Sequence, residues 1–86
     1  MERISGPYKG YFIAAYTVAA GNNFVGYAKV CAEAPADVWN AGAVERLASA
    51  TGFLTEQEAL VAAERKAREV IADIVGSPVS GPAPLD

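Results

Sequence analysis

The segment from Thr55 to Val75 has the pattern of one amphipathic helix, with a start signal and an apolar stripe that agree. Thr55 and Glu58 form a capping box, in which the Thr55 hydroxyl accepts a hydrogen bond from the Glu58 amide and the Glu58 carboxylate accepts one from the Thr55 amide. The apolar stripe predicts that one face of the helix is buried against another element. Its members recur at steps of three and four residues: Ala59, Leu60, Ala63, Ala67, Val70, Ile71 and Ile74.

The opposite face of this helix is charged, and we expect it to be exposed to water. Two pairs of opposite charge lie four residues apart on that face, Glu64 with Arg68 and Arg65 with Glu69. This spacing brings side chains together on a helix surface, and each pair is expected to add about 0.2–0.5 kcal/mol to helix stability.

With 86 residues, the chain is expected to form one domain with a small core. The hydrophobic share is 52%, but 18 of these residues are alanines, so large apolar side chains are fewer than the share suggests. This composition favours a thin layer of helix on sheet. The net charge of −3 gives no basic excess of the kind that nonspecific nucleic-acid binding requires, so nucleic acid is not the expected partner.

The first half of the chain has the pattern of a β-hairpin. Tyr8 to Val18 is dense in aromatic and β-branched residues and contains no proline, which predicts a strand. Ala20 to Asn23 supplies turn residues that tolerate positive φ, and Phe24 to Ala32 resumes the strand pattern. Met1 to Pro7 is short and polar, and we expect it to be a flexible lead-in.

The middle of the chain has two possible structures. Glu33 to Asp37 contains a proline and predicts a break, after which Val38 to Thr51 is either a short helix or a loop followed by a strand. In the second case the loop runs from Trp39 to Gly42 and the strand from Val44 to Thr51. We prefer the strand, because a glycine in the middle disfavours the helix and a third strand gives the C-terminal helix a platform.

Together these elements predict an α+β fold of the order β-β-β-α, in which a three-stranded antiparallel sheet packs on one C-terminal helix. The domain is expected to span residues 8–76. Gly76 favours the left-handed conformation that follows a last helical turn, and Pro78 disfavours continuation, so a sharp helix end is predicted there. Residues 77–86 are rich in proline, glycine and serine and are expected to be a disordered tail.

The sequence offers few groups for catalysis or for binding a cofactor. Cys31 is the one cysteine and the chain has no histidine, which excludes the usual zinc and haem ligand sets. We therefore expect no metal, no cofactor and no enzymatic activity. A lone cysteine favours a reducing, cytoplasmic setting. The longest apolar stretch, Tyr11 to Ala20, is half of the roughly 20 residues that a membrane span requires, so no membrane association is expected.

Aromatic residues crowd the predicted hairpin, and one helix can cover one face of a sheet only. We therefore expect an exposed aromatic face that binds a protein partner or a second copy of the chain. The alternative is a binder of single-stranded nucleic acid or a small ligand on the same face. Trp39 is either an interface anchor or a lid over one end of the core. The candidate interaction residues are Tyr8, Tyr11, Phe12, Tyr16, Phe24, Tyr27 and Trp39.

The predicted order of elements resembles small β-β-β-α domains of uncharacterised bacterial proteins. It also distantly resembles the N-terminal module of HicB-type antitoxins, in which a glycine-containing turn precedes Thr-x-x-Glu-Ala and a long helix. Here the matching residues run from Gly52 through Thr55-x-x-Glu58-Ala59 to Ala63. This resemblance implies a domain that binds a partner protein and has no catalytic residues.

Overall fold

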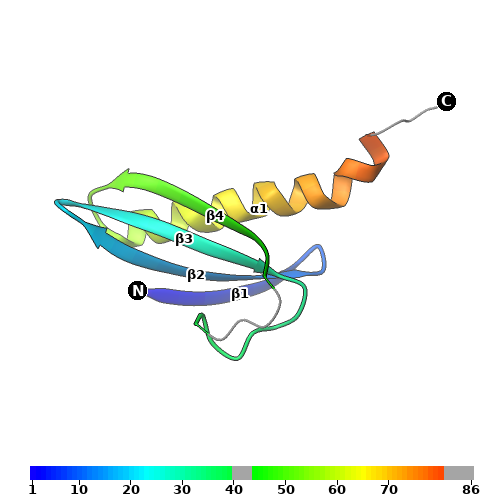
Figure 1. Ribbon diagram of the computed structural model, residues 1–86, viewed down its shortest axis with the longest axis horizontal. Helices are drawn as coiled ribbons and strands as arrows, with labels where there is room; N and C mark the ends of the chain where they lie inside the picture. The colour runs from blue at the N-terminus through cyan, green and yellow to red at the C-terminus, as the bar shows by residue number, and fades with distance from the viewer. Residues whose placement is uncertain (40–43, 81–86) are drawn as a thin grey trace.

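The computed structural model describes residues 1–39 and 44–80, with the backbone alone for 77–80. It is a four-stranded antiparallel sheet with one C-terminal helix across one face (Figure 1). The α+β class, the antiparallel sheet and the C-terminal helix are therefore confirmed, whereas the prediction of three strands is wrong. The strands follow one another in the sheet as in the chain: β1 Glu2–Tyr8, β2 Tyr11–Ala20, β3 Asn23–Cys31 and β4 Val44–Phe53, followed by α1 Glu56–Ser80.

The additional strand, β1, occupies the segment that was expected to be a flexible lead-in. The predicted strand from Tyr8 to Val18 is divided by a two-residue turn, because Tyr8 pairs with Tyr11 across Lys9 and Gly10. Lys9 has φ of 51° and Gly10 has φ of 87°. A hairpin loop of two residues with positive φ is the type I′ arrangement, whose twist matches that of the flanking strands. Lysine seldom adopts positive φ, which is why the sequence did not indicate this turn.

The hairpin of β2 and β3 is confirmed. Ala20 pairs with Asn23 across a two-residue turn in which Gly21 has φ of 64°. The preferred third strand is also confirmed as β4, and the short-helix alternative is wrong for this segment. The predicted loop from Trp39 to Gly42 lies mostly outside the described residues.

The core lies between α1 and the face of the sheet that it covers. Gly26 allows the closest approach, since a Cβ atom there would lie 2.0 Å from the carbonyl oxygen of Ala59. The alanines of both layers likewise let the helix axis come near the sheet. The buried cluster consists of Ile13, Ala15, Ala28, Val30 and Ala48 from the sheet and Leu60, Ala63, Ala67 and Ile71 from the helix.

The helix begins where the sequence predicted but ends later. The amide of Glu58 donates to Oγ1 of Thr55 at 3.1 Å, so Thr55 caps the first turn. At the other end, φ of Gly76 lies outside the left-handed range and the helical backbone continues to Ser80. The expected stop at Gly76 is therefore not observed, and the last turns project beyond the sheet (Figure 1). Residues 81–86 of the predicted tail lie outside the described residues.

Both edge strands of the sheet contain bulges. In β1, two residues lie between Ser5 and Tyr8, whereas one residue of β2 lies opposite them. In β4, the pairing with β3 shifts twice. One shift lies between Ala50 and Phe53, which pair with Gly26 and Phe24, and the other lies between Val44 and Arg46, which pair with Cys31 and Val30. Each bulge interrupts the regular ladder at an edge and increases the local twist.

The candidate interaction surface on the open sheet face

The sheet face opposite α1, here called the open face, receives only part of the predicted aromatic set. Tyr8 and Tyr11 pack against the core beneath α1. Phe24 has the same strand parity as buried Ala28, so it also lies on the helix side. The remaining candidates are on the open face or on the loop that crosses it: Phe12, Tyr16, Tyr27 and Trp39.

The loop that follows β3 folds over one end of the open face. Ala14 and Cys31 alternate with the core residues of their strands, so their side chains point away from α1. Both are nonetheless buried, with exposed fractions of 0% and 1%. Val38 in the loop is 3% exposed. The loop therefore supplies a second, smaller apolar layer at this end of the sheet.

Trp39 extends this layer toward the middle of the open face. Its ring is tilted against Tyr16, with centroids 4.7 Å apart, and Tyr16 in turn stacks on Tyr27 at 5.2 Å. The ammonium of Lys29 lies 5.6 Å from the ring centroids of both Tyr16 and Trp39 and donates to the carbonyl oxygen of Val38 at 2.9 Å. We call Tyr16, Tyr27, Lys29 and Trp39 the aromatic cluster. The Trp39 ring covers Tyr16 on the open face and is itself 56% exposed, so it is not a lid over the core beneath α1. Its role as an interface anchor stays a prediction.

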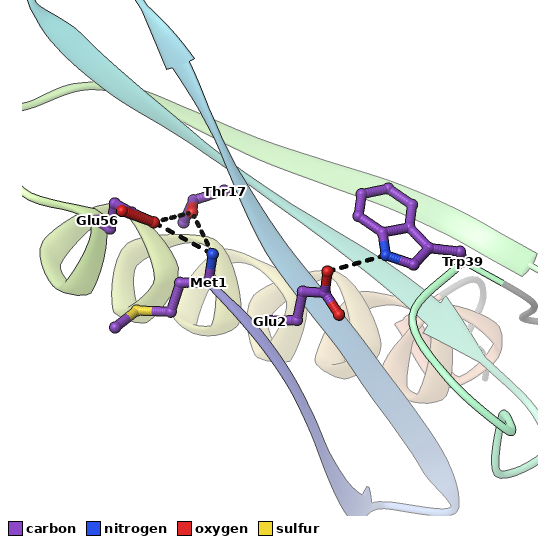
Figure 2. A network of polar contacts seen from close by, with 5 residues as sticks. All are labelled: Met1, Glu2, Thr17, Trp39 and Glu56. Carbon is purple, nitrogen blue, oxygen red and sulfur yellow. Dashed lines mark hydrogen bonds and ion pairs between the residues drawn. The ribbon is translucent and has the colours of Figure 1, made fainter.

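Two further hydrogen bonds fix the position of Trp39. Its backbone amide donates to Oδ1 of Asp37 at 2.8 Å, and its indole Nε1 donates to Oε2 of Glu2 at 2.9 Å. Figure 2 shows the indole turned toward the Glu2 carboxylate of β1. Strand β1, which the sequence did not indicate, therefore holds the loop on the sheet.

On the helix side, the residue before Glu2 makes a separate polar network. The Met1 ammonium donates to Oε1 of Glu56 at 3.1 Å and to Oγ1 of Thr17 at 3.3 Å, and the Thr17 hydroxyl donates to the same Glu56 oxygen at 3.1 Å (Figure 2). The hydrogen bond from the ammonium, together with that from Thr17, lowers the pKa of Glu56 below its usual value. This network joins the start of α1 to the first two strands.

The exposed apolar residues also concentrate on the open face. Strand register and alternation place Ile4, Val18, Val44 and Leu47 there, beside the aromatic cluster. With Trp39, they make up five of the eight large apolar residues that are exposed in the described part of the chain, with exposed fractions between 39% and 58%. We call these five residues the apolar patch: Ile4, Val18, Trp39, Val44 and Leu47. The sequence interpretation missed the four aliphatic members because it considered aromatic residues only.

The reactive group nearest this surface is the Cys31 thiol. Burial raises the pKa of the Cys31 thiol, an effect that Lys29 opposes and Glu45 reinforces. Among the described residues, no three His, Cys, Asp or Glu side chains gather as metal ligands would. In the same residues, no helix combines the length and apolar character needed to cross a membrane.

Comparison of the chain with protein-family models, with characterised proteins and with solved structures gave no match. The resemblance to the HicB-type module and to small bacterial β-β-β-α domains therefore stays a prediction.

Proposed function

We propose that this protein is a noncatalytic interaction module whose open face binds another protein chain. The observation that carries the proposal is the apolar patch. Single exposed apolar residues are ordinary on protein surfaces, but a gathering of them on one face is typical of a binding site. Here five of the eight exposed large apolar residues of the described chain lie on one face of the sheet, between Val44 near one end and Val18 near the other.

The aromatic cluster suits such an interface. Tyr16, Tyr27 and Trp39 are held in contact by stacking and by the bond from the indole to Glu2, so little side-chain entropy remains to be lost on binding. Tryptophan and tyrosine are also the residue types that most often dominate binding energy at protein interfaces. The cluster therefore provides a preorganised centre with the aliphatic members of the apolar patch around it.

The alternative function, binding of single-stranded nucleic acid on the same face, is less well supported. Such platforms combine stacking aromatics with cations that contact phosphates. Among the residues that the described strands place on the open face, Lys29 is the one cation, and its ammonium already donates to Val38. Apolar contact with a protein accounts for more of the surface than phosphate binding does.

A buried free thiol at Cys31 is compatible with a reducing compartment, and our proposal locates the protein in the cytoplasm. No cofactor is part of the proposed function.

The proposal is tested with Leu47→Lys and Val18→Lys, each of which places a charge in the apolar patch. Val75→Lys is the matched control, because Val75 and Val18 are similarly exposed, at 45% and 44%, and Val75 lies on α1. Each tagged protein is used to recover partners from a native lysate, and the affinity of any partner is then measured with purified components. Circular dichroism verifies that every variant is folded.

We expect wild type and Val75→Lys to bind the same partner protein, and both patch variants to lose it. Equal binding by the patch variants, or recovery of no partner by wild type, contradicts the proposal. Quenching of Trp39 fluorescence by single-stranded oligonucleotides at physiological salt would instead favour the nucleic-acid function.

A further inference from the structure

A second unpartnered surface lies on α1, remote from the open face. It is a shallow depression of about 310 Å³ at the junction of the end of β4 with the first half of the helix. Phe53, Val61 and Ala62 form its apolar part, and the side chains of Val61 and Ala62 are only partly buried. We call this surface the helix flank, and its lining residues are Phe53, Gln57, Glu58, Val61, Ala62 and Arg65.

Two opposite charges border the apolar part of the helix flank. Glu58 and Arg65 are seven residues apart, which corresponds to two helical turns and a rise of about 10.5 Å. Both side chains are exposed. The ion pairs found in the described residues, Met1 with Glu56 and Arg3 with Glu64, include neither of them. The helix flank thus presents one acid and one base without an ion-pair partner within that part of the chain.

We propose that a second copy of this chain docks on the helix flank, with the two α1 helices antiparallel and the two-fold axis passing between Val61 and Ala62. In this arrangement Glu58 faces the partner's Arg65, and Arg65 faces the partner's Glu58. At the centre, Val61 packs against the partner's Ala62. The small alanine side chain allows two helices to approach within the 8–10 Å between axes that packed helices adopt.

The pattern of charges selects a second copy over other occupants. Glu58 precedes Val61 by three residues, and Arg65 follows Ala62 by three residues, so the acid and the base are equidistant from the proposed axis. A two-fold interface brings the same patch of each copy together and therefore requires this self-complementary order. A peptide of uniform charge would satisfy one of the two side chains and be repelled by the other.

The helix flank and the open face are separate surfaces, because α1 covers the opposite side of the sheet. A dimer formed through the helix flank leaves both apolar patches accessible. It would present two copies of the partner-binding face proposed above, so that a bivalent or repetitive partner would be held more tightly than by a single copy.

The experiment uses charge reversal and light scattering coupled to size-exclusion chromatography, at concentrations from about 1 μM to about 1 mM. Arg65→Glu leaves two acids on the helix flank, and Glu58→Arg leaves two bases. Each variant alone places like charges opposite each other. An equal mixture of the two variants restores both opposite-charge pairs across a heterodimer. Lys66→Glu carries the same charge change as Arg65→Glu at an exposed helix position that does not line the depression.

We expect wild type and Lys66→Glu to dimerise, and each flank variant alone to dimerise on the order of tenfold more weakly or not at all. The mixture is expected to recover the dimer. A wild type that stays monomeric throughout the concentration range, flank variants that still dimerise, or a mixture that stays monomeric would each overturn the proposal.

The same measurements distinguish this inference from the proposed function. Leu47→Lys is expected to keep the dimer while losing the partner, and Arg65→Glu to keep the partner while losing the dimer. If Leu47→Lys abolishes the dimer and Arg65→Glu does not, self-association belongs to the open face and the helix-flank proposal fails.

Discussion

Arg3 of β1 binds the carboxylate of Glu64 in α1 through two hydrogen bonds, one of them from Nε to Oε2 at 2.9 Å. The carboxylate raises the pKa of Arg3 through hydrogen bonding and charge. Glu64 is 6% exposed, although the helical pattern assigns it to the face that meets water. An edge strand and a helix separated by most of the chain are thus joined by an ion pair whose carboxylate is buried, whereas the Arg3 side chain is 44% exposed.

Arg3→Ala is therefore expected to lower the free energy of unfolding by about 1–3 kcal/mol, since it leaves a buried carboxylate without its partner. Arg3→Ala/Glu64→Leu should recover much of the loss, because no unpaired charge then remains. Lys66→Ala, an exposed change on the same helix, is the control. Urea denaturation of the four proteins measures the effect, and equal midpoints for Arg3→Ala and Lys66→Ala would contradict it.

The cap of α1 is tested by Thr55→Ala. The substitution removes the Oγ1 acceptor of the Glu58 amide and should destabilise the protein by about 1 kcal/mol. Gln57→Ala, an exposed first-turn change that leaves the cap intact, should have an effect within about 0.5 kcal/mol. Both are read from urea midpoints, and a Thr55→Ala midpoint equal to that of wild type would show that the cap does not stabilise the helix.

Gly26 and Gly76 should respond oppositely to alanine. At Gly26 the added Cβ would lie 2.0 Å from the Ala59 carbonyl oxygen, so the helix must shift away from the sheet, and we expect a loss of about 3 kcal/mol or more. At Gly76 a Cβ meets nothing within 4 Å and the backbone is helical, so alanine should stabilise by up to about 1 kcal/mol.

Thermal unfolding of Gly26→Ala and Gly76→Ala measures both changes in stability, and we expect the first variant to melt below wild type and the second above it. A destabilising Gly76→Ala would mean that the residue adopts left-handed backbone and ends the helix in solution. A harmless Gly26→Ala would mean that α1 does not approach β3 as closely as the structure shows.

Burial of Cys31 predicts a pH dependence at the alkaline end. Its pKa is higher in the folded protein than in the unfolded chain, so the folded state binds the thiol proton more tightly. The stability it contributes is therefore complete below the unfolded pKa of about 8.5 and is lost as the pH rises through the folded value. Cys31→Val removes this contribution.

The measurement compares urea unfolding of wild type and Cys31→Val between about pH 7 and pH 10, a range that begins below the ordinary thiol pKa. Wild type should lose more stability than Cys31→Val over this range. Parallel pH curves for the two proteins would show that Cys31 is not buried as a thiol.

Local chemistry determined which elements the sequence could predict. The start of α1 is indicated by Thr55 and Glu58, which are three residues apart, and the turn at Gly21 by a glycine at a position that needs positive φ. Strand β1 pairs with β2, which is adjacent in sequence, but two of its side chains are held by distant residues: Arg3 by Glu64, and Glu2 by Trp39. It also follows a turn that places a lysine at positive φ, which residue preferences disfavour.

Only part of the candidate surface could be predicted from the sequence. Both alternating sets of the β2 segment are apolar, so alternation alone cannot show which set α1 covers. The structure puts Tyr8, Tyr11 and Phe24 on the helix side and brings Tyr16, Tyr27 and Trp39 together on the other. The two-residue period does group Val18 with Tyr16, so the sequence could have joined these two residues in one set, although it could not show the face on which that set lies.

The bulged edges of the sheet affect how readily molecules of this protein aggregate at high concentration. An open sheet with straight, regular edges can accept a strand from a neighbouring molecule and continue into a ribbon without a defined length. Here the pairing pattern breaks in β1 and twice in β4, so neither side offers a regular template for another strand. The bulges therefore disfavour the addition of a strand from another molecule at either edge of the sheet. Association between molecules then depends on contacts between side chains, which can form a complex of defined size.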